Sequence, residues 1–270
     1  RQMATPASTH MRAMQAGYSG QGAVQAAELA AVGIIGDKEV FEGRYGVYHN
    51  YVSHRTREPD WRELTGELGT DFPILKQLGT KVWPACGYTR PVNAAIIHMR
   101  KTHNIDPTTV EEIEIRGGQG ATRLLSEPPH EKARPKISID AKYSIPYTCS
   151  IAMLKGDIKL GDYLDEALAN PIHHAMGDKF HYVEDPEASA KSPMPIVTIR
   201  TNDNEYQHQV TGLPGDVNHP VSQERLEDKF RDAASFSANP VTDKDIEEVV
   251  KLCATLESLE DATAIIKLLS

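Results

Sequence analysis

The alternation of apolar and charged residues places the predicted strands in the middle of the chain. Residues 110–116 alternate between the two kinds from Glu112 onward, which predicts a half-buried β-strand. Two further segments, 194–200 and 205–210, flank the polar segment Thr201-Asn202-Asp203-Asn204, and this arrangement predicts a β-hairpin. We therefore expect a small sheet between residues 110 and 210.

Helical spacing of apolar residues predicts helices on both sides of these strands and between them. Residues 91–103 and 144–155 have apolar side chains at intervals of three and four. Near the end of the chain, Thr242 and Asp245 resemble a capping box. One apolar stripe follows it, made of Ile246, Val249, Val250, Cys253 and Leu256.

Small residues dominate a predicted helix over residues 11–32. Its glycines lower helix propensity, a cost that close packing against neighbouring helices would offset. We expect this helix to be nearly all buried, against helices of this chain or of another subunit. Gly33 is suited to end it in the left-handed conformation, and Asp37 is suited to cap a second helix over 38–43.

This order of elements predicts an α+β protein in which an all-helical body carries an inserted α+β lid domain with an antiparallel sheet. Gly and Pro in 78–86 indicate a chain reversal, where we place a domain boundary. The predicted domains are 1–78, the first part of the helical body, 79–217, the lid, and 218–270, the returning C-terminal helices that pack with 1–78. Residues 118–136 are polar and rich in Pro, and we expect a loop there.

Charge and cysteine content narrow the class of function. The net charge of −9 argues against a nucleic-acid or anionic membrane partner, although a few cations in one cleft would still hold a small anion. The three cysteines are widely spaced, so they indicate neither a zinc site nor a disulfide framework. With no apolar run long enough to cross a bilayer, we expect a cytoplasmic protein.

Four segments in order resemble the MmgE/PrpD family. They are the alanine-rich stretch of 11–46, KVWPACGYTRP at 81–91, DAKYSIPYTCSIAMLKG at 140–156 and GDVNHPVSQERLEDKF at 215–230. The second is similar to the family's Lys-x-Tyr-Pro-x-Cys-x-x-Thr-His element, and the third to its Ser-x-x-Tyr helix. The family's helical body begins upstream of this chain, so part of its active site would be missing here or lie on another chain.

The resemblance implies an enzyme that removes a proton next to a carboxylate of a small polycarboxylic acid, without a cofactor or metal. We expect a lyase of the 2-methylcitrate-dehydratase type, which eliminates water from a hydroxy-polycarboxylate. An epimerase of an imino- or amino-dicarboxylate of the iminodisuccinate kind, a decarboxylase of the same family, and an inactive or half-site subunit that binds small acids remain open. The resemblance also implies a homodimer, and a second polypeptide is a possible source of the missing helical part.

Five residues are candidates for the site. A carbanion next to a carboxylate needs nearby cations or strong donors and a base within reach. Lys81 and Tyr147, placed at one cleft by the resemblance, are the expected catalytic cation and proton-transfer group, with Cys86 beside them. Arg12 and Arg90 are the expected carboxylate ligands. Each also has a structural interpretation: surface charges for the three cations, a helix-core phenol for Tyr147 and a buried small residue for Cys86.

Overall fold

The computed structural model describes residues 11–51, 60–118, 121–187 and 194–270, without the side chains at 12, 13, 63, 64 and 121. Contacts divide the chain into one unit at Thr9–Leu78 and a second made chiefly of Gly79–Ser270. Each unit is described by itself. Within the described residues, every helix is too short or too polar to cross a membrane.

The Thr9–Leu78 unit is helical in its described part. Its helices are α1 (Met11–Ala31), α2 (Val47–Tyr51), α3 (Trp61–Thr65) and α4 (Pro73–Gln77). The predicted helix over 11–32 is confirmed, and Gly33 follows it with φ 93°. The predicted helix over 38–43 is wrong: Asp37 does accept a hydrogen bond from the Glu39 amide, but turns follow it.

The described side chains of α1 are exposed, apart from the half-buried Gln15. The prediction of a nearly all-buried helix is therefore wrong for α1 within its own unit. Gly17, Gly20 and Gly22 have no neighbouring atom within 4 Å of where a Cβ would stand, so close packing does not explain them here. Burial of α1 against another subunit stays a prediction.

The Gly79–Ser270 unit holds the sheet and most of the core. Its helices are η2 (Gly87–Thr89), α5 (Arg90–His103), η3 (Pro107–Thr109), α6 (Ala121–Ser126), α7 (Pro129–Ala133), α8 (Ser138–Lys142), α9 (Ile145–Lys155), η4 (Leu160–Tyr163), α10 (Asp165–Leu168), α11 (Pro171–Gly177), α13 (Gln223–Ala234), α14 (Asp243–Ala254), η5 (Leu256–Ser258) and α15 (Thr263–Leu268). Its strands are β1 (Val110–Gly117), β2 (Phe180–Glu184), β3 (Ile196–Thr201) and β4 (Glu205–His208).

The four strands form one sheet in the order β2-β1-β3-β4. The predicted hairpin is confirmed as the antiparallel pair β3 and β4, and β1 also runs antiparallel to β3. The prediction of a wholly antiparallel sheet is wrong, because β1 pairs with β2 in parallel, with Ile113 opposite Phe180. A parallel pair needs a long crossover, and helices α6 to α11 supply it.

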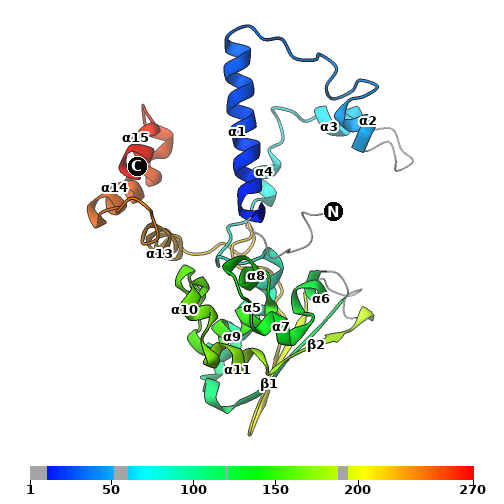
Figure 1. Ribbon diagram of the computed structural model, residues 1–270, viewed down its shortest axis with the longest axis vertical. Helices are drawn as coiled ribbons and strands as arrows, with labels where there is room; N and C mark the ends of the chain where they lie inside the picture. Colours follow the sequence, from blue (N-terminus) through cyan, green and yellow to red (C-terminus); the bar gives the residue numbers. More distant parts are fainter. Residues whose placement is uncertain (1–10, 52–59, 119–120, 188–193) are drawn as a thin grey trace. The chain divides into compact units, whose positions relative to one another are not determined.

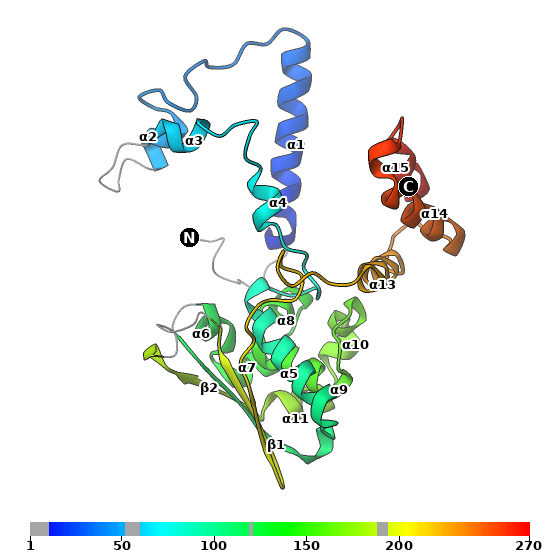
Figure 2. The same cartoon turned by 180° about the vertical axis from the view of Figure 1, so that it is seen from behind.

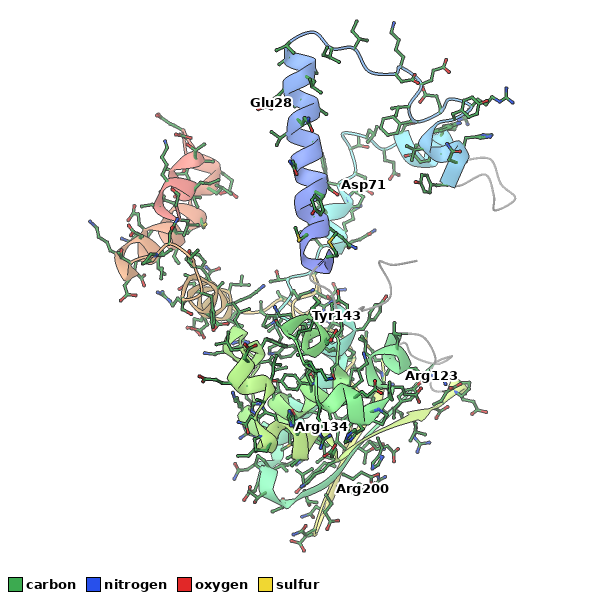
Figure 3. All side chains as sticks on the ribbon, viewed as in Figure 1. Glu28, Asp71, Arg123, Arg134, Tyr143 and Arg200 are labelled. Atoms are coloured by element: carbon green, nitrogen blue, oxygen red, sulfur yellow. The ribbon has the colours of Figure 1, made fainter. Side chains whose placement is uncertain are left out.

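One face of this sheet is covered and the other is solvated. Figures 1 and 2 show α5, α7, α9 and α11 on the same side of the sheet. Ile113 and Ile115 point into the core, whereas Glu114 alternates with them and pairs with Arg200, which Figure 3 labels on β3. The α+β class predicted from the sequence is thereby confirmed, and the half-buried strand pattern of 110–116 is explained.

Helix α9 forms the centre of the covered layer. The Ser144 hydroxyl caps it by accepting a hydrogen bond from the Tyr147 amide at 3.0 Å. Gly156 ends it in the left-handed conformation with φ 71°. Because apolar and small side chains surround the whole helix rather than one stripe, α9 is buried from Ile145 to Met153.

The two ends of the α+β segment meet. The Thr80 amide donates to the Gly215 carbonyl at 2.7 Å, and Gly215 has φ 92°. A Cβ on Gly215 would lie 1.9 Å from the Thr80 carbonyl oxygen, so this close approach requires glycine.

Beyond Gly215 the chain continues into the helices α13, α14 and α15. The predicted cap of α14 is confirmed, since the Thr242 hydroxyl accepts from the Asp245 amide. The packing of 218–270 against 1–78 stays a prediction.

Candidate functional site

The segment that begins at Lys81 is anchored by its neighbours, while the Lys81 side chain is exposed. Trp83 is buried, and its indole N–H donates to Asp157 Oδ1 at 2.9 Å. The same carboxylate receives two hydrogen bonds from the Arg225 guanidinium, at 2.6 and 2.8 Å. Burial raises the pKa of Asp157, but the hydrogen bonds and charge of Arg225 outweigh it, and the pKa lies below its ordinary value.

Helix α13 reaches this segment through three residues on one face. Arg225, Lys229 and Asp232 are spaced by four and three residues, so their side chains lie on the same side of the helix. The Lys229 ammonium donates to the Lys81 carbonyl oxygen at 2.6 Å, and Asp232 accepts from the Leu160 amide at 3.0 Å. Together with the Arg225 pair, these contacts fix α13 beside Lys81.

Lys229 is a cation that the site prediction missed. Its pKa is lowered by burial first, and then by the nearby charges of Lys81 and Arg225. Within the described residues, neither Lys81 nor Lys229 has a carboxylate within 4.0 Å, whereas Arg225 is neutralised by Asp157. The structure therefore places the ammonium of one uncompensated lysine, Lys229, against the backbone of another, Lys81. The sequence shows the helical spacing of Arg225 and Lys229, but it does not show which groups they bond to.

Cys86 is half-buried at the start of η2. Its amide donates to the Lys142 carbonyl at 2.8 Å, and its carbonyl accepts from the Thr89 hydroxyl at 2.9 Å. Burial lowers the pKa of the Lys142 ammonium, which lies 5.3 Å from the centre of the Tyr163 ring. Cys86 thus lies next to a second partly buried lysine that the sequence did not single out. Its predicted catalytic role stays a prediction.

Arg90 has a partner within the chain. Its guanidinium lies 3.2 Å from Asp216 Oδ1 and 3.4 Å from the Pro214 carbonyl oxygen. The Arg90 Nε is buried and has no hydrogen-bond partner among the described residues. The guanidinium therefore fastens α5 to the loop that leaves the α+β segment. Binding a substrate carboxylate, as predicted, would require it to exchange Asp216 for the ligand.

Tyr147 is fully buried, in agreement with the alternative of a helix-core phenol. Its hydroxyl donates to the Asp162 carbonyl at 2.7 Å, and its ring lies 6.3 Å from Tyr163 and 6.1 Å from His173. Burial, and then the charge of Asp162, raise the pKa of Tyr147 well above its ordinary value. A phenol that shuttles a proton needs a lowered pKa, so this environment suits a hydrogen-bond donor instead.

The structure does not join Lys81 to Tyr147. The first side chain is exposed and the second lies in the core, and among the described residues no hydrogen bond or ring contact links them. The Arg12 side chain lies outside the described residues, and its helix belongs to the other unit. The predicted meeting of Lys81, Tyr147 and Arg12 in one cleft stays a prediction.

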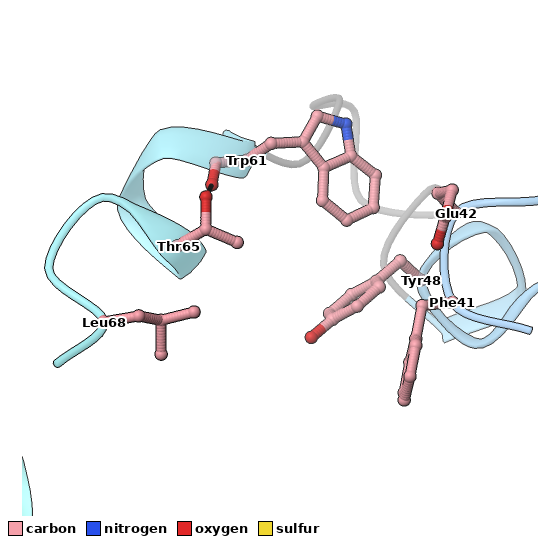
Figure 4. A pocket seen from close by; sticks show the side chains of 6 residues that line it. All are labelled: Phe41, Glu42, Tyr48, Trp61, Thr65 and Leu68. Carbon is pink, nitrogen blue, oxygen red and sulfur yellow. Dashed lines mark hydrogen bonds between the residues drawn. The ribbon is translucent and has the colours of Figure 1, made fainter.

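A separate hollow of about 600 Å³ lies in the Thr9–Leu78 unit. Figure 4 shows its lining, which comprises Phe41, Glu42, Tyr48, Trp61, Thr65 and Leu68. The Tyr48 and Trp61 rings meet edge to face, with centroids 5.2 Å apart. Glu42 is the one charged residue of this lining, so the hollow offers no cation to a polycarboxylate. The described residues also contain no cluster of three or more His, Cys, Asp or Glu side chains that would hold a metal ion.

Comparison with known protein families identifies the family to which this chain belongs. The profile of the MmgE/PrpD C-terminal domain matches residues 83–255, which is more than half of the 270 residues. The chain belongs to the MmgE/PrpD family. The resemblance identified from the sequence is confirmed, and this family domain includes Cys86, Arg90, Tyr147 and Lys229, with Lys81 just before it.

A curated relative gives a more distant comparison. The chain is 20% identical over 271 residues to the cis-aconitate decarboxylase-like protein oryM of Aspergillus oryzae, strain ATCC 42149 / RIB 40. The alignment covers 96% of this MmgE/PrpD chain and 55% of the relative. The chain thus spans about half the length of that protein.

Proposed function

We propose that this MmgE/PrpD chain takes part in the removal of a proton next to a carboxylate of a small polycarboxylic acid, as a cofactor-independent lyase of the 2-methylcitrate-dehydratase type. Membership of the family carries this proposal. The uncompensated charge of Lys81 and Lys229 supports it, because a carbanion next to a carboxylate is stabilised by fixed cations. Water would leave from the neighbouring carbon once the proton is lost.

Decarboxylation of a similar acid is the second candidate. The curated relative, named cis-aconitate decarboxylase-like, favours it. By resemblance, Cys86 stands where decarboxylases of the family have histidine, and Arg90 replaces the histidine of the family's Thr-His element. These two departures count against decarboxylation. Dehydration and epimerisation begin with the loss of the same proton, so one experiment tests the step they share.

Exchange of the α-proton for deuterium, followed by NMR, tests this proposal. The chain is incubated in D₂O with a panel of di- and tricarboxylates, and we expect exchange with at least one hydroxy-polycarboxylate. The Lys81→Met variant should lose exchange, whereas Lys251→Met, which removes an exposed lysine paired with Glu248, should retain it. Evolution of CO₂ without prior exchange would favour the decarboxylase. Binding of acids with neither reaction would contradict the lyase and favour a half-site subunit.

We propose a homodimer as the working form, because the family resemblance implies it, and a cytoplasmic location, because the widely spaced cysteines favour a reducing compartment. The exposed apolar side chains of α1, which include Met14, Tyr18 and Leu29, support a further protein surface against this helix. Sedimentation of the chain at several concentrations tests the assembly, and a monomer at all of them would contradict it.

A further inference from the structure

We infer that Lys229 on α13 and Lys81 together form one binding point for a carboxylate group of the substrate. This inference rests on the proposed function and adds to it a residue from the C-terminal helices. Of these two lysines, the sequence motifs indicate only Lys81 as a site residue. The structure adds Lys229, whose ammonium nitrogen lies 2.6 Å from the Lys81 carbonyl oxygen.

The geometry holds the Lys229 ammonium at the backbone of Lys81, and among the described residues no carboxylate lies within ion-pair distance of either lysine. Arg225 and Asp232 attach α13 on either side of Lys229, through Asp157 and the Leu160 amide. Lys229 is therefore fixed between two anchor points and is not free to move away from Lys81. Its single hydrogen bond in the described chain goes to a neutral carbonyl, so two donor positions of the ammonium remain for a ligand.

Charge supports the same assignment. The protein has a net charge of −9, yet in the described chain neither of these two lysines has a carboxylate within ion-pair distance. Burial, and then repulsion by the positive charges of Lys81 and Arg225, lower the pKa of Lys229. A bound carboxylate would relieve the repulsion, because one anion interacts favourably with both ammonium groups.

A purely structural role for Lys229 is the rival explanation. In that case the ammonium would only tie α13 to residue 81, as Asp232 ties it to Leu160. The two roles differ in their response to an anion. A tether stabilises the folded chain whether or not an acid is present, whereas a binding group changes the affinity for the acid.

Calorimetric titration of the full chain with propane-1,2,3-tricarboxylate, at constant ionic strength, separates the two roles. This tricarboxylate has no hydroxyl to eliminate, so it reports binding alone. Lys229→Met should weaken binding about ten- to a hundredfold, the usual effect of losing a hydrogen bond to a charged group. Lys229→Arg should restore most of the affinity. Asp232→Ala, which removes a neighbouring anchor of α13 but no cation, should change it less than threefold.

Three results would overturn the inference. These are no binding by the unmodified chain, unchanged affinity in Lys229→Met, or equal losses in Lys229→Met and Asp232→Ala. Inorganic sulfate at the same ionic strength provides a further arm, and equal affinity for sulfate would overturn the assignment to a carboxylate. Failure here with α-proton exchange intact leaves the proposed function standing. Binding through Lys229 without exchange would instead remove the proposed lyase activity while the binding point stands.

Discussion

The Tyr147 hydroxyl offers a direct test of the core geometry. Tyr147→Phe keeps the ring and removes only the buried donor to the Asp162 carbonyl at 2.7 Å. A lost hydrogen bond costs about 1 kcal/mol net, and a buried acceptor left without its donor costs about 1–3 kcal/mol. We therefore expect the free energy of unfolding to fall by about 2 kcal/mol.

Tyr163→Phe is the matched control. Tyr163 lies in the same cluster and is only 4% exposed, but its hydroxyl has no hydrogen-bond partner among the described residues. Removing this hydroxyl takes away a buried polar atom and breaks no described bond, so stability should stay the same or rise slightly. The two variants differ in one respect: the hydroxyl removed from Tyr147 has a hydrogen-bond acceptor, and the hydroxyl removed from Tyr163 has none among the described residues.

Urea unfolding of the full chain, followed by circular dichroism, measures both variants. The midpoint should shift for Tyr147→Phe while the slope stays that of the unmodified chain. Equal midpoints for the two variants would refute the reasoning. Turnover measured in parallel tests the catalytic prediction: if the hydroxyl also stabilises charge in the transition state, kcat should fall by ~10² or more in Tyr147→Phe.

Three further predictions concern other anchors of the unit. Gly156→Ala should lower the free energy of unfolding by about 1–2 kcal/mol, because φ is 71° and the new Cβ would lie 2.4 Å from a guanidinium nitrogen of Arg100. Thermal unfolding would detect this loss of stability, and an unchanged midpoint would contradict the prediction. Ser144→Ala removes the cap of α9 and should cost about 0.5–2 kcal/mol in urea titrations, whereas no loss would mean that the cap is dispensable. The lowered pKa of Asp157 means that its stabilising contribution is present above the pKa of the unfolded state, about 3.9, and is lost as pH falls through the folded value. In Arg225→Met this loss of stability in acid should begin at higher pH. Identical pH profiles of stability for Arg225→Met and the unmodified chain would count against the ion pair.

Local pattern predicted much of this fold. The alternation around Ile113 and Ile115 marks β1, and the polar segment Thr201–Asn204 marks the hairpin, because both signals lie within a few adjacent residues. Strand β2 is not predicted by local pattern, because its five residues alternate weakly and its partner β1 lies far away in the chain. The prediction of a loop over 118–136 is wrong, because α6 and α7 both lie within it. Pro129 begins α7, since proline is tolerated in the first turn of a helix.

The site was predictable only in part, for the same reason. Motifs pointed to Lys81 and Tyr147, but burial and partners decide what each group does. The partner of Arg90 is Asp216, 126 residues away, and that of Lys229 is a backbone carbonyl 148 residues away. No periodicity or motif reports such long-range pairs. Whether Cys86 and Arg12 act in catalysis or binding likewise depends on neighbours that sequence spacing does not specify.

The hydrogen bond between Thr80 and Gly215 makes the α+β segment an insert whose two ends are joined at one point. Its two ends are adjacent, so the chain enters and leaves at one point. Such a segment can lengthen, shorten or exchange its loops without displacing the residues that flank it. The same closure makes 80–215 suitable for circular permutation, with a short linker across the junction and new ends in an exposed turn such as Thr201–Asn204. Gly215 would be a residue to preserve in any such rearrangement, because a side chain there would collide with the Thr80 carbonyl.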